Sequence, residues 1–168
     1  MASFFAALPM VAALLLIGAG IAKVLAPSSA VDGLKAVGLP ATAFMVRFGA
    51  LLEALLGAVN LWTSSPIARV LLALSYLAFA AYLNVARTSP QVKSCGCFGE
   101  RGSPPTVRQI VVDLLVAVGV VVSLVVKSPT LAQLISADVM SAIGVLCLSA
   151  LSAWLMTFVL DPPVERTP

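Results

Sequence analysis

Five apolar runs, each about 20 residues long, dominate the chain and leave few folds open to it. They cover about residues 3–25, 43–62, 66–86, 108–126 and 138–160. A helix of that length crosses about 30 Å of hydrocarbon, and only helices and closed barrels satisfy their backbone polar groups inside a bilayer. The runs therefore predict an all-α integral membrane bundle, with a four-helix core and a fifth transmembrane helix.

The composition supports a membrane protein rather than a soluble domain. Of the 168 residues, 61% are hydrophobic and 10% are charged, whereas soluble domains carry about 25% charged residues. The net charge of +3 implies no nucleic-acid partner, because membrane proteins collect Lys and Arg in loops and no basic patch with interleaved aromatic residues is present. The predicted location is the inner or plasma membrane of the cell, as a multi-pass protein in contact with the lipid bilayer.

The chain is predicted to form one transmembrane domain, residues 1–160, followed by a disordered tail at 161–168. A short interfacial helix is expected from Val31 to Val37, in the connection after the first run. Residues 87–107 form the longest loop, which is rich in Pro, Gly and Ser and is unlike any regular element. Residues 127–137 are interpreted as a short polar link.

The long loop carries two of the three cysteines, Cys95 and Cys97, with Gly96 between them. A disulfide needs Cα atoms roughly 4.4–6.8 Å apart, and Gly96 permits the tight turn because it can adopt φ > 0. The resulting small ring would be strained, and strained exposed disulfides are oxidising and labile rather than structural. The pair therefore predicts redox chemistry, with Cys95 and Cys97 as the catalytic residues.

The neighbours of the thiol pair largely suit this chemistry. Lys93 and Arg101 would favour a thiolate, while Glu100 would oppose it. Phe98 and Gly99 would offer an apolar surface and a flexible exit to a substrate disulfide or a docking partner.

Two other functions remain open for the pair. The chain contains no histidine, so it lacks the commonest general base and transition-metal ligand. Cys95 and Cys97 alone would suit a soft ion such as Cu(I) or Hg(II), which makes soft-metal binding or transport the alternative. In the third reading the pair is incidental and the protein is a non-catalytic scaffold subunit. Cys147, in the middle of the fifth run, is interpreted as a packing residue.

Two carboxylates lie inside the apolar runs, where ionisable groups are functional candidates by default. Glu53 lies near the middle of the second run, with Gly49 and Gly57 four residues to either side. Small residues on one face let another helix approach closely, so Glu53 is expected to point into the bundle. Asp113 lies one to two turns into the fourth run.

Two roles are open for these carboxylates. In the structural role, Glu53 pairs with Arg47, Lys23 or a tyrosine and locks the bundle. In the functional role, Glu53 or Asp113 relays protons for thiol exchange or for a quinone. Lys23, at the end of the first run, can snorkel to the interface.

Loop charges suggest an orientation, because Lys and Arg collect in cytoplasmic loops. Eight cations fall on the side of the long loop and two on the other. The first group is Lys23, Lys35, Arg47, Arg87, Lys93, Arg101, Arg108 and Arg166, and the second is Arg69 and Lys127. This bias places the N-terminus outside the cell, and the cysteine loop and the C-terminus in the cytoplasm.

Four short motifs are shared with a known family. CGCFG follows the third run, and the fourth run opens with Arg108. GAGIAKVLAP closes the first run, and LLEALLGA lies in the second. Over about residues 10–126 the chain thereby resembles the MauE family, small membrane proteins grouped with DoxX-like proteins. Asp113 departs from the pattern, because an asparagine is expected near this position, and the fifth run lies outside the family's four-helix core.

The resemblance implies membrane thiol–disulfide chemistry beside a thioredoxin-like partner, serving disulfides outside the cytoplasm. The predicted function is thus a thiol–disulfide oxidoreductase that cycles the Cys-Gly-Cys pair with a thioredoxin-like or exported thiol protein. The electron acceptor would be that partner or a membrane quinone, and no other cofactor is predicted. The resemblance favours the outer face for the loop and the charge count favours the cytoplasm, so the sequence leaves both faces open.

Overall fold

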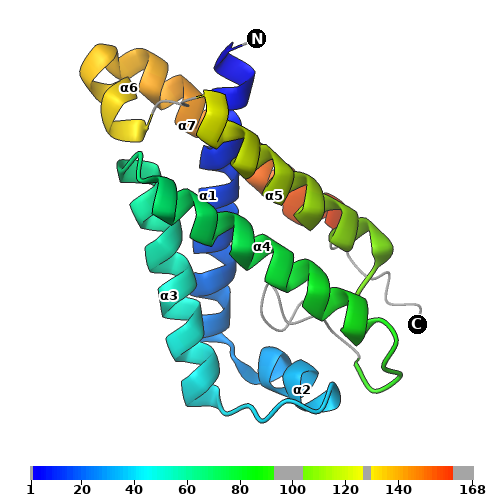
Figure 1. Cartoon of the computed structure of the whole chain (residues 1–168). Helices are drawn as coiled ribbons and strands as arrows, with labels where there is room; N and C mark the ends of the chain where they lie inside the picture. Colours follow the sequence, from blue (N-terminus) through cyan, green and yellow to red (C-terminus); the bar gives the residue numbers. More distant parts are fainter. Residues whose placement is uncertain (1, 93–103, 127–129, 161–168) are drawn as a thin grey trace, which may run out of the picture.

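The computed structural model of the chain describes residues 2–92, 104–126 and 130–160 (Figure 1). Within these residues it contains seven helices and no strand, which confirms the all-α prediction. The helices are α1 (Ala2–Leu25), α2 (Ser28–Ala36), α3 (Ala43–Trp62), α4 (Pro66–Ala86), α5 (Val107–Val126), α6 (Leu131–Ala137) and α7 (Val139–Leu160). The five predicted runs match α1, α3, α4, α5 and α7 to within one residue at either end.

Four helices, α1, α3, α4 and α5, are long and apolar enough to cross a bilayer. Large apolar side chains cover the outside of the bundle, among them Phe44, Leu55 and Leu115, which are 60–78% exposed. A helix on the surface of a soluble protein turns a polar face outward, so this surface suits lipid, and the chain is a membrane protein. The described apolar stretch of α7 covers Ala142–Ser152, and a fifth crossing by α7 stays a prediction.

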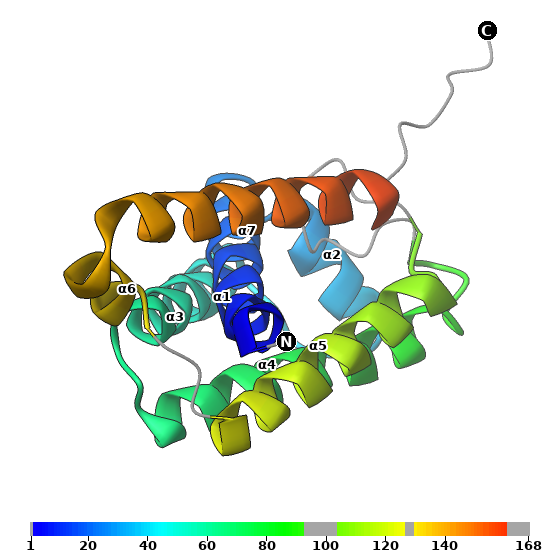
Figure 2. The same ribbon diagram turned by 90° about the horizontal axis from the view of Figure 1, so that it is seen from above.

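Helix α1 lies at the centre of the bundle. It packs along α3 and also contacts α4, α5 and α7. Figure 2 shows α1 almost end-on, with α7 on one side and the α4–α5 pair on the other. Leu16 of α1, Leu72 and Tyr76 of α4, and Val120 of α5 form one buried cluster. The side chain of Lys23 on α1 is buried among these helices, whereas Ile21 and Leu25 of the same helix are exposed.

The α1–α3 contact is close because glycines bring the two backbones together. A Cβ atom on Gly20 would lie 2.6 Å from the carbonyl oxygen of Ala50, and one on Gly57 would lie 2.7 Å from the carbonyl oxygen of Ala13. The prediction that small residues admit a second helix is therefore confirmed at Gly57. It is wrong at Gly49, where an added Cβ would meet no atom within 4 Å.

Arg69 joins α4 to the end of α5. Its side chain is buried, and its Nη1 donates a 2.7 Å hydrogen bond to the carbonyl oxygen of Ser123. Ser123 lies in the last turn of α5, where four carbonyls lack intrahelical partners, so Arg69 caps this helix. From the sequence, Arg69 is counted among the loop cations. However, Arg69 and Lys23 are both buried. Without these two residues, seven cations remain on the side of the long loop and one, Lys127, on the other side.

Two connections differ from the prediction. Helix α2 begins at Ser28 and ends at Ala36, earlier than the expected Val31–Val37. The short polar link contains α6, a helix that the sequence did not predict. Thr130 and Gln133 form a capping box: the Thr130 hydroxyl accepts from the Gln133 amide, and the Gln133 side chain accepts from the Thr130 amide. This pairing starts a helix at the following residue.

Candidate functional site

The predicted catalytic pair and its neighbours lie outside the described residues. These are Cys95, Cys97, Gly96, Phe98, Gly99, Lys93 and Arg101. The two helices that flank the segment are described: α4 ends at Ala86, α5 begins at Val107, and the two pack side by side. The segment therefore leaves and re-enters the bundle at one end, which is also where α1 ends and α3 begins (Figure 1).

A partly buried ion pair lies near this end of the bundle. The Lys23 ammonium nitrogen lies 2.7 Å from a carboxylate oxygen of Glu53, and the two side chains are 9% and 23% exposed. This is one of the pairings that the sequence left open, and it locks α1 to α3. The snorkelling of Lys23 is wrong, because the carboxylate holds the ammonium inside the bundle. Arg47 instead donates from Nε to the carbonyl oxygen of Val24, at 3.2 Å.

Two aromatic rings of α4 complete the surroundings of the ammonium. The Lys23 nitrogen lies 4.3 Å from the centre of the Phe79 ring, a cation–π contact. Phe79 meets the Tyr76 ring edge to face, with ring centres 6.3 Å apart. The Tyr76 hydroxyl donates a 2.7 Å hydrogen bond to the carbonyl oxygen of Ala12. Tyr76 therefore holds α4 against α1.

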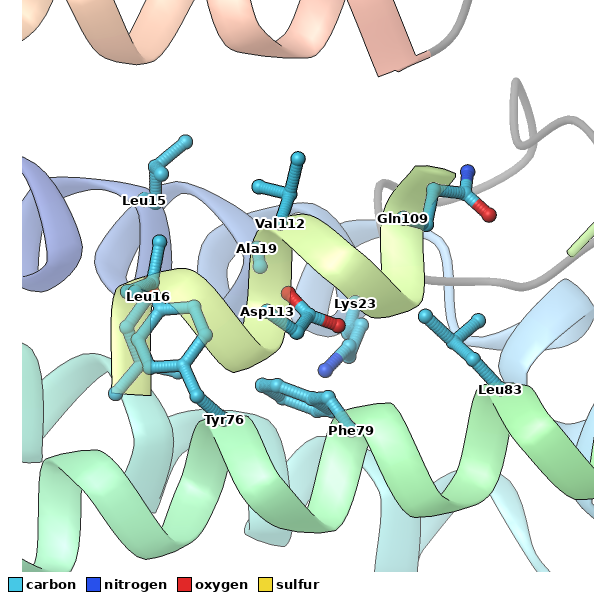
Figure 3. A pocket seen from close by; sticks show the side chains of 11 residues that line it. Leu15, Leu16, Ala19, Lys23, Tyr76, Phe79, Leu83, Gln109, Val112 and Asp113 are labelled. Carbon is cyan, nitrogen blue, oxygen red and sulfur yellow. The ribbon is translucent and has the colours of Figure 1, made fainter. Parts of the chain in front are cut away.

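A cavity of about 60 Å³ lies between α1, α4 and α5, beside the ion pair. Four polar side chains line it, those of Lys23, Asp113, Gln109 and Tyr76, and the rest of its wall is apolar. Figure 3 shows the Asp113 carboxyl group and the Lys23 ammonium directed toward each other across this space. The cavity is large enough for water, which needs about 10–15 Å³. The Lys23 ammonium is thus paired with Glu53 and faces Asp113 across the cavity.

The cavity reaches the helix ends that carry the cysteine segment. Leu83 lines it within the last turn of α4, and Gln109 lines it within the first turn of α5. A carboxylate paired with an ammonium can accept a proton and return it without moving far. The charged cluster formed by Lys23, Glu53 and Asp113 can therefore hold and release a proton near these ends of α4 and α5.

The sequence pointed to the two carboxylates, but it gave Lys23 only as one of several possible partners for Glu53. Lys23 was interpreted as an interfacial side chain, although a lysine inside an apolar run is itself a signal of a buried partner. Phe79 and Gln109 carried no signal, because neither an aromatic nor an amide residue stands out in such a run. Helices that are apolar on all sides do not show which face is turned inward.

Metal binding finds no support among the described residues. They contain no group of three or more His, Cys, Asp or Glu side chains placed to hold a metal ion.

Cys147 lies on α7 with its side chain exposed, so its interpretation as a packing residue is wrong.

Comparison with known proteins gives one match. The family model described as methylamine utilisation protein MauE matches residues 1–126. This range begins in α1 and ends with α5, and it includes the cysteine segment and all three members of the charged cluster. No curated protein and no solved structure matches the chain.

Proposed function

Since the chain belongs to the MauE family, we propose that it is a membrane thiol–disulfide oxidoreductase that cycles Cys95 and Cys97 between dithiol and disulfide. The observation that carries the proposal is the Cys-Gly-Cys sequence between two helices whose adjoining ends border a charged cavity. Two thiols one residue apart form a strained, reactive disulfide rather than a stabilising one.

The reaction exchanges a disulfide between the loop and a protein partner. In the oxidising direction, a partner thiolate attacks the Cys95–Cys97 bond, forms a mixed disulfide and releases the other cysteine as a thiolate. A second partner thiolate then attacks the mixed disulfide and releases the loop as a dithiol. The partner loses two electrons and two protons, and the loop gains them. The reverse sequence of steps reduces the partner.

The charged cluster supports this chemistry through its position. Thiol exchange requires protons to leave one thiol and reach another, and the chain has no histidine to carry them. Asp113 lines the cavity that borders the helix ends next to the cysteine segment, and Lys23 joins it to Glu53. Asp113 and Glu53 are the positioning and proton-carrying residues of the proposed site.

Single cysteine substitutions test the proposal, because they stop exchange at the mixed disulfide. We expect Cys95→Ser or Cys97→Ser, each in a Cys147→Ser background, to accumulate a covalent adduct with another protein in cells. Removing Cys147 eliminates an exposed thiol that would otherwise cross-link. The adduct should appear on a non-reducing gel, disappear with dithiothreitol, and be absent from the double variant.

The trapped protein identifies the class of partner. A thioredoxin-like protein or an exported thiol protein would fit the proposal, and its compartment would assign the face of the membrane. The absence of an adduct from both single variants, together with wild-type behaviour of the double variant, would contradict the redox role and favour a scaffold. Stoichiometric metal that is lost from both variants would favour the soft-metal function.

A further inference from the structure

A second pocket, of about 340 Å³, lies between α1, α2, α3 and α4 and shares Lys23 with the first. Its volume falls within the range of about 300–1,000 Å³ that is typical of small-molecule sites. Lys23, Glu53 and Tyr82 are the polar side chains of its wall. Aliphatic and aromatic side chains, such as Leu34 and Phe79, form most of the remainder.

The pocket is polar at its buried end and apolar at its rim. The Lys23 side chain is 9% exposed, whereas Leu39 and Met45 at the rim are 51% and 55% exposed. Met45 lies on α3, one of the helices suited to crossing the bilayer. A ligand that matches this change from polar to apolar side chains has a compact polar head inside the protein. Its hydrocarbon tail leaves through the apolar rim. A phospholipid has the opposite arrangement, because its polar head lies at the water interface.

The charges of Lys23, Glu53 and Asp113 favour a ligand whose polar head is neutral. Lys23 is already paired with Glu53, and Asp113 faces it from the neighbouring cavity. The cluster therefore carries more negative than positive side chains when both carboxylates are ionised, which disfavours an anionic ligand. An ammonium group has three N–H donors, and one of them is used by Glu53. A neutral ligand oxygen is the acceptor that suits the others.

We propose that this pocket binds a membrane quinone, with Lys23 donating a hydrogen bond to a quinone carbonyl oxygen. The proposal rests on the proposed function, because a Cys95–Cys97 dithiol must pass its electrons to an acceptor before it can oxidise another partner. As the S–S bond forms, the dithiol loses two electrons and two protons, and the quinone takes up both and becomes a hydroquinone. Glu53 and Asp113, which flank Lys23, supply the protons to the two quinone oxygens.

Gly49 offers a way to fill the pocket without disturbing the fold. It lines the pocket, and a Cβ at this position would meet no atom within 4 Å. Gly49→Leu therefore places a branched side chain in the space that a quinone head would occupy. Gly18 provides the matched control, because it lies on α1, is exposed, has the same open surroundings and lines neither pocket.

The probe is decylubiquinone, added to the full chain in phosphatidylcholine nanodiscs and followed by quenching of tryptophan fluorescence. We expect saturable quenching in the wild type and in Gly18→Leu. In Gly49→Leu the Kd should rise about tenfold or more, which corresponds to the binding free energy of one well-made buried contact. No saturable quenching, or equal affinity in Gly49→Leu and the wild type, would overturn the proposal. So would native mass spectrometry showing a phospholipid that Gly49→Leu displaces while decylubiquinone fails to bind.

A cysteine-free variant separates this inference from the proposed function. The pocket contains neither Cys95 nor Cys97, so the double serine variant should bind decylubiquinone with wild-type affinity. Reduced wild-type protein should convert bound decylubiquinone to its hydroquinone, one per Cys95–Cys97 disulfide formed. Binding without this conversion would overturn the proposed electron transfer from the thiol pair, while the pocket would remain assigned as a quinone-binding site. Partner adducts without any quinone binding would overturn the pocket alone.

Discussion

Replacing Lys23 by methionine should destabilise the folded bundle by about 1–3 kcal/mol, the usual effect of leaving a partly buried charged group without its hydrogen-bond partner. Methionine keeps the length and apolar stem of lysine. It leaves the carboxylates of Glu53 and Asp113 without the ammonium that pairs with one and faces the other. The free energy of unfolding would be measured in mixed micelles by raising the fraction of sodium dodecyl sulfate, with far-ultraviolet circular dichroism as the signal.

Asp113→Asn and Lys35→Met are the matched comparisons. The first removes the carboxylate that faces the ammonium without pairing with it, so Glu53 keeps its pair and the cost should stay near about 1 kcal/mol. The second removes an exposed lysine in the last turn of α2 and should cost no more than about 1 kcal/mol. Equal losses in Lys23→Met and Asp113→Asn would show that Lys23 does not hold the cluster together.

Gly20→Ala should destabilise the bundle by about 1–3 kcal/mol, although it adds a single methyl group. The new Cβ would lie 2.6 Å from the carbonyl oxygen of Ala50 and 3.0 Å from the amide nitrogen of Ala54. Both atoms belong to the backbone of α3, so no side chain can rotate away and the two helices must separate. Their separation would also lengthen the Lys23–Glu53 contact. The same unfolding titration would measure the loss.

Gly18→Ala should act in the opposite direction. Gly18 lies two residues away on α1, and an added Cβ there would meet no atom within 4 Å. Alanine in a helix interior is favoured over glycine by roughly 0.5–1 kcal/mol. Gly57→Ala, which adds a Cβ 2.7 Å from the backbone of α1, should behave like Gly20→Ala. A loss at Gly18 as large as that at Gly20 would contradict the close α1–α3 contact.

The membrane helices could be predicted from the sequence because the length of each apolar run shows where a helix lies. The second and third runs match Ala43–Trp62 and Pro66–Ala86 at both ends. Polar caps set these boundaries: the hydroxyls of Thr42 and Ser65 each accept from an amide of the following turn. Helix α6 has a similar cap at Thr130. It was not predicted because the apolar segment that follows Thr130 is short.

The partners of the buried charges could be predicted only in part. Glu53 was expected to point inward, and Lys23 was one of its possible partners, but nothing local distinguishes Lys23 from Arg47. The choice depends on how α1 crosses α3, which is set by close backbone contacts at Gly20 and Gly57, about one helical turn from the charges. Arg69 was misread for a related reason. It follows a turn and therefore resembles a loop cation. Its hydrogen bond to the carbonyl oxygen of Ser123 depends on the arrangement of α4 beside α5.

The central position of α1 also affects how the protein is made. Synthesis produces α1 first, yet every helix that encloses it comes later in the chain. Lys23 leaves the ribosome 30 residues ahead of Glu53, so α1 enters the bilayer before its counter-charge exists. At that moment the lysine, near the helix end, can extend its ammonium to the interface, and pairing draws it inward once α3 arrives. The first two membrane helices are therefore expected to leave the insertion machinery as a hairpin, with the ion pair formed between them.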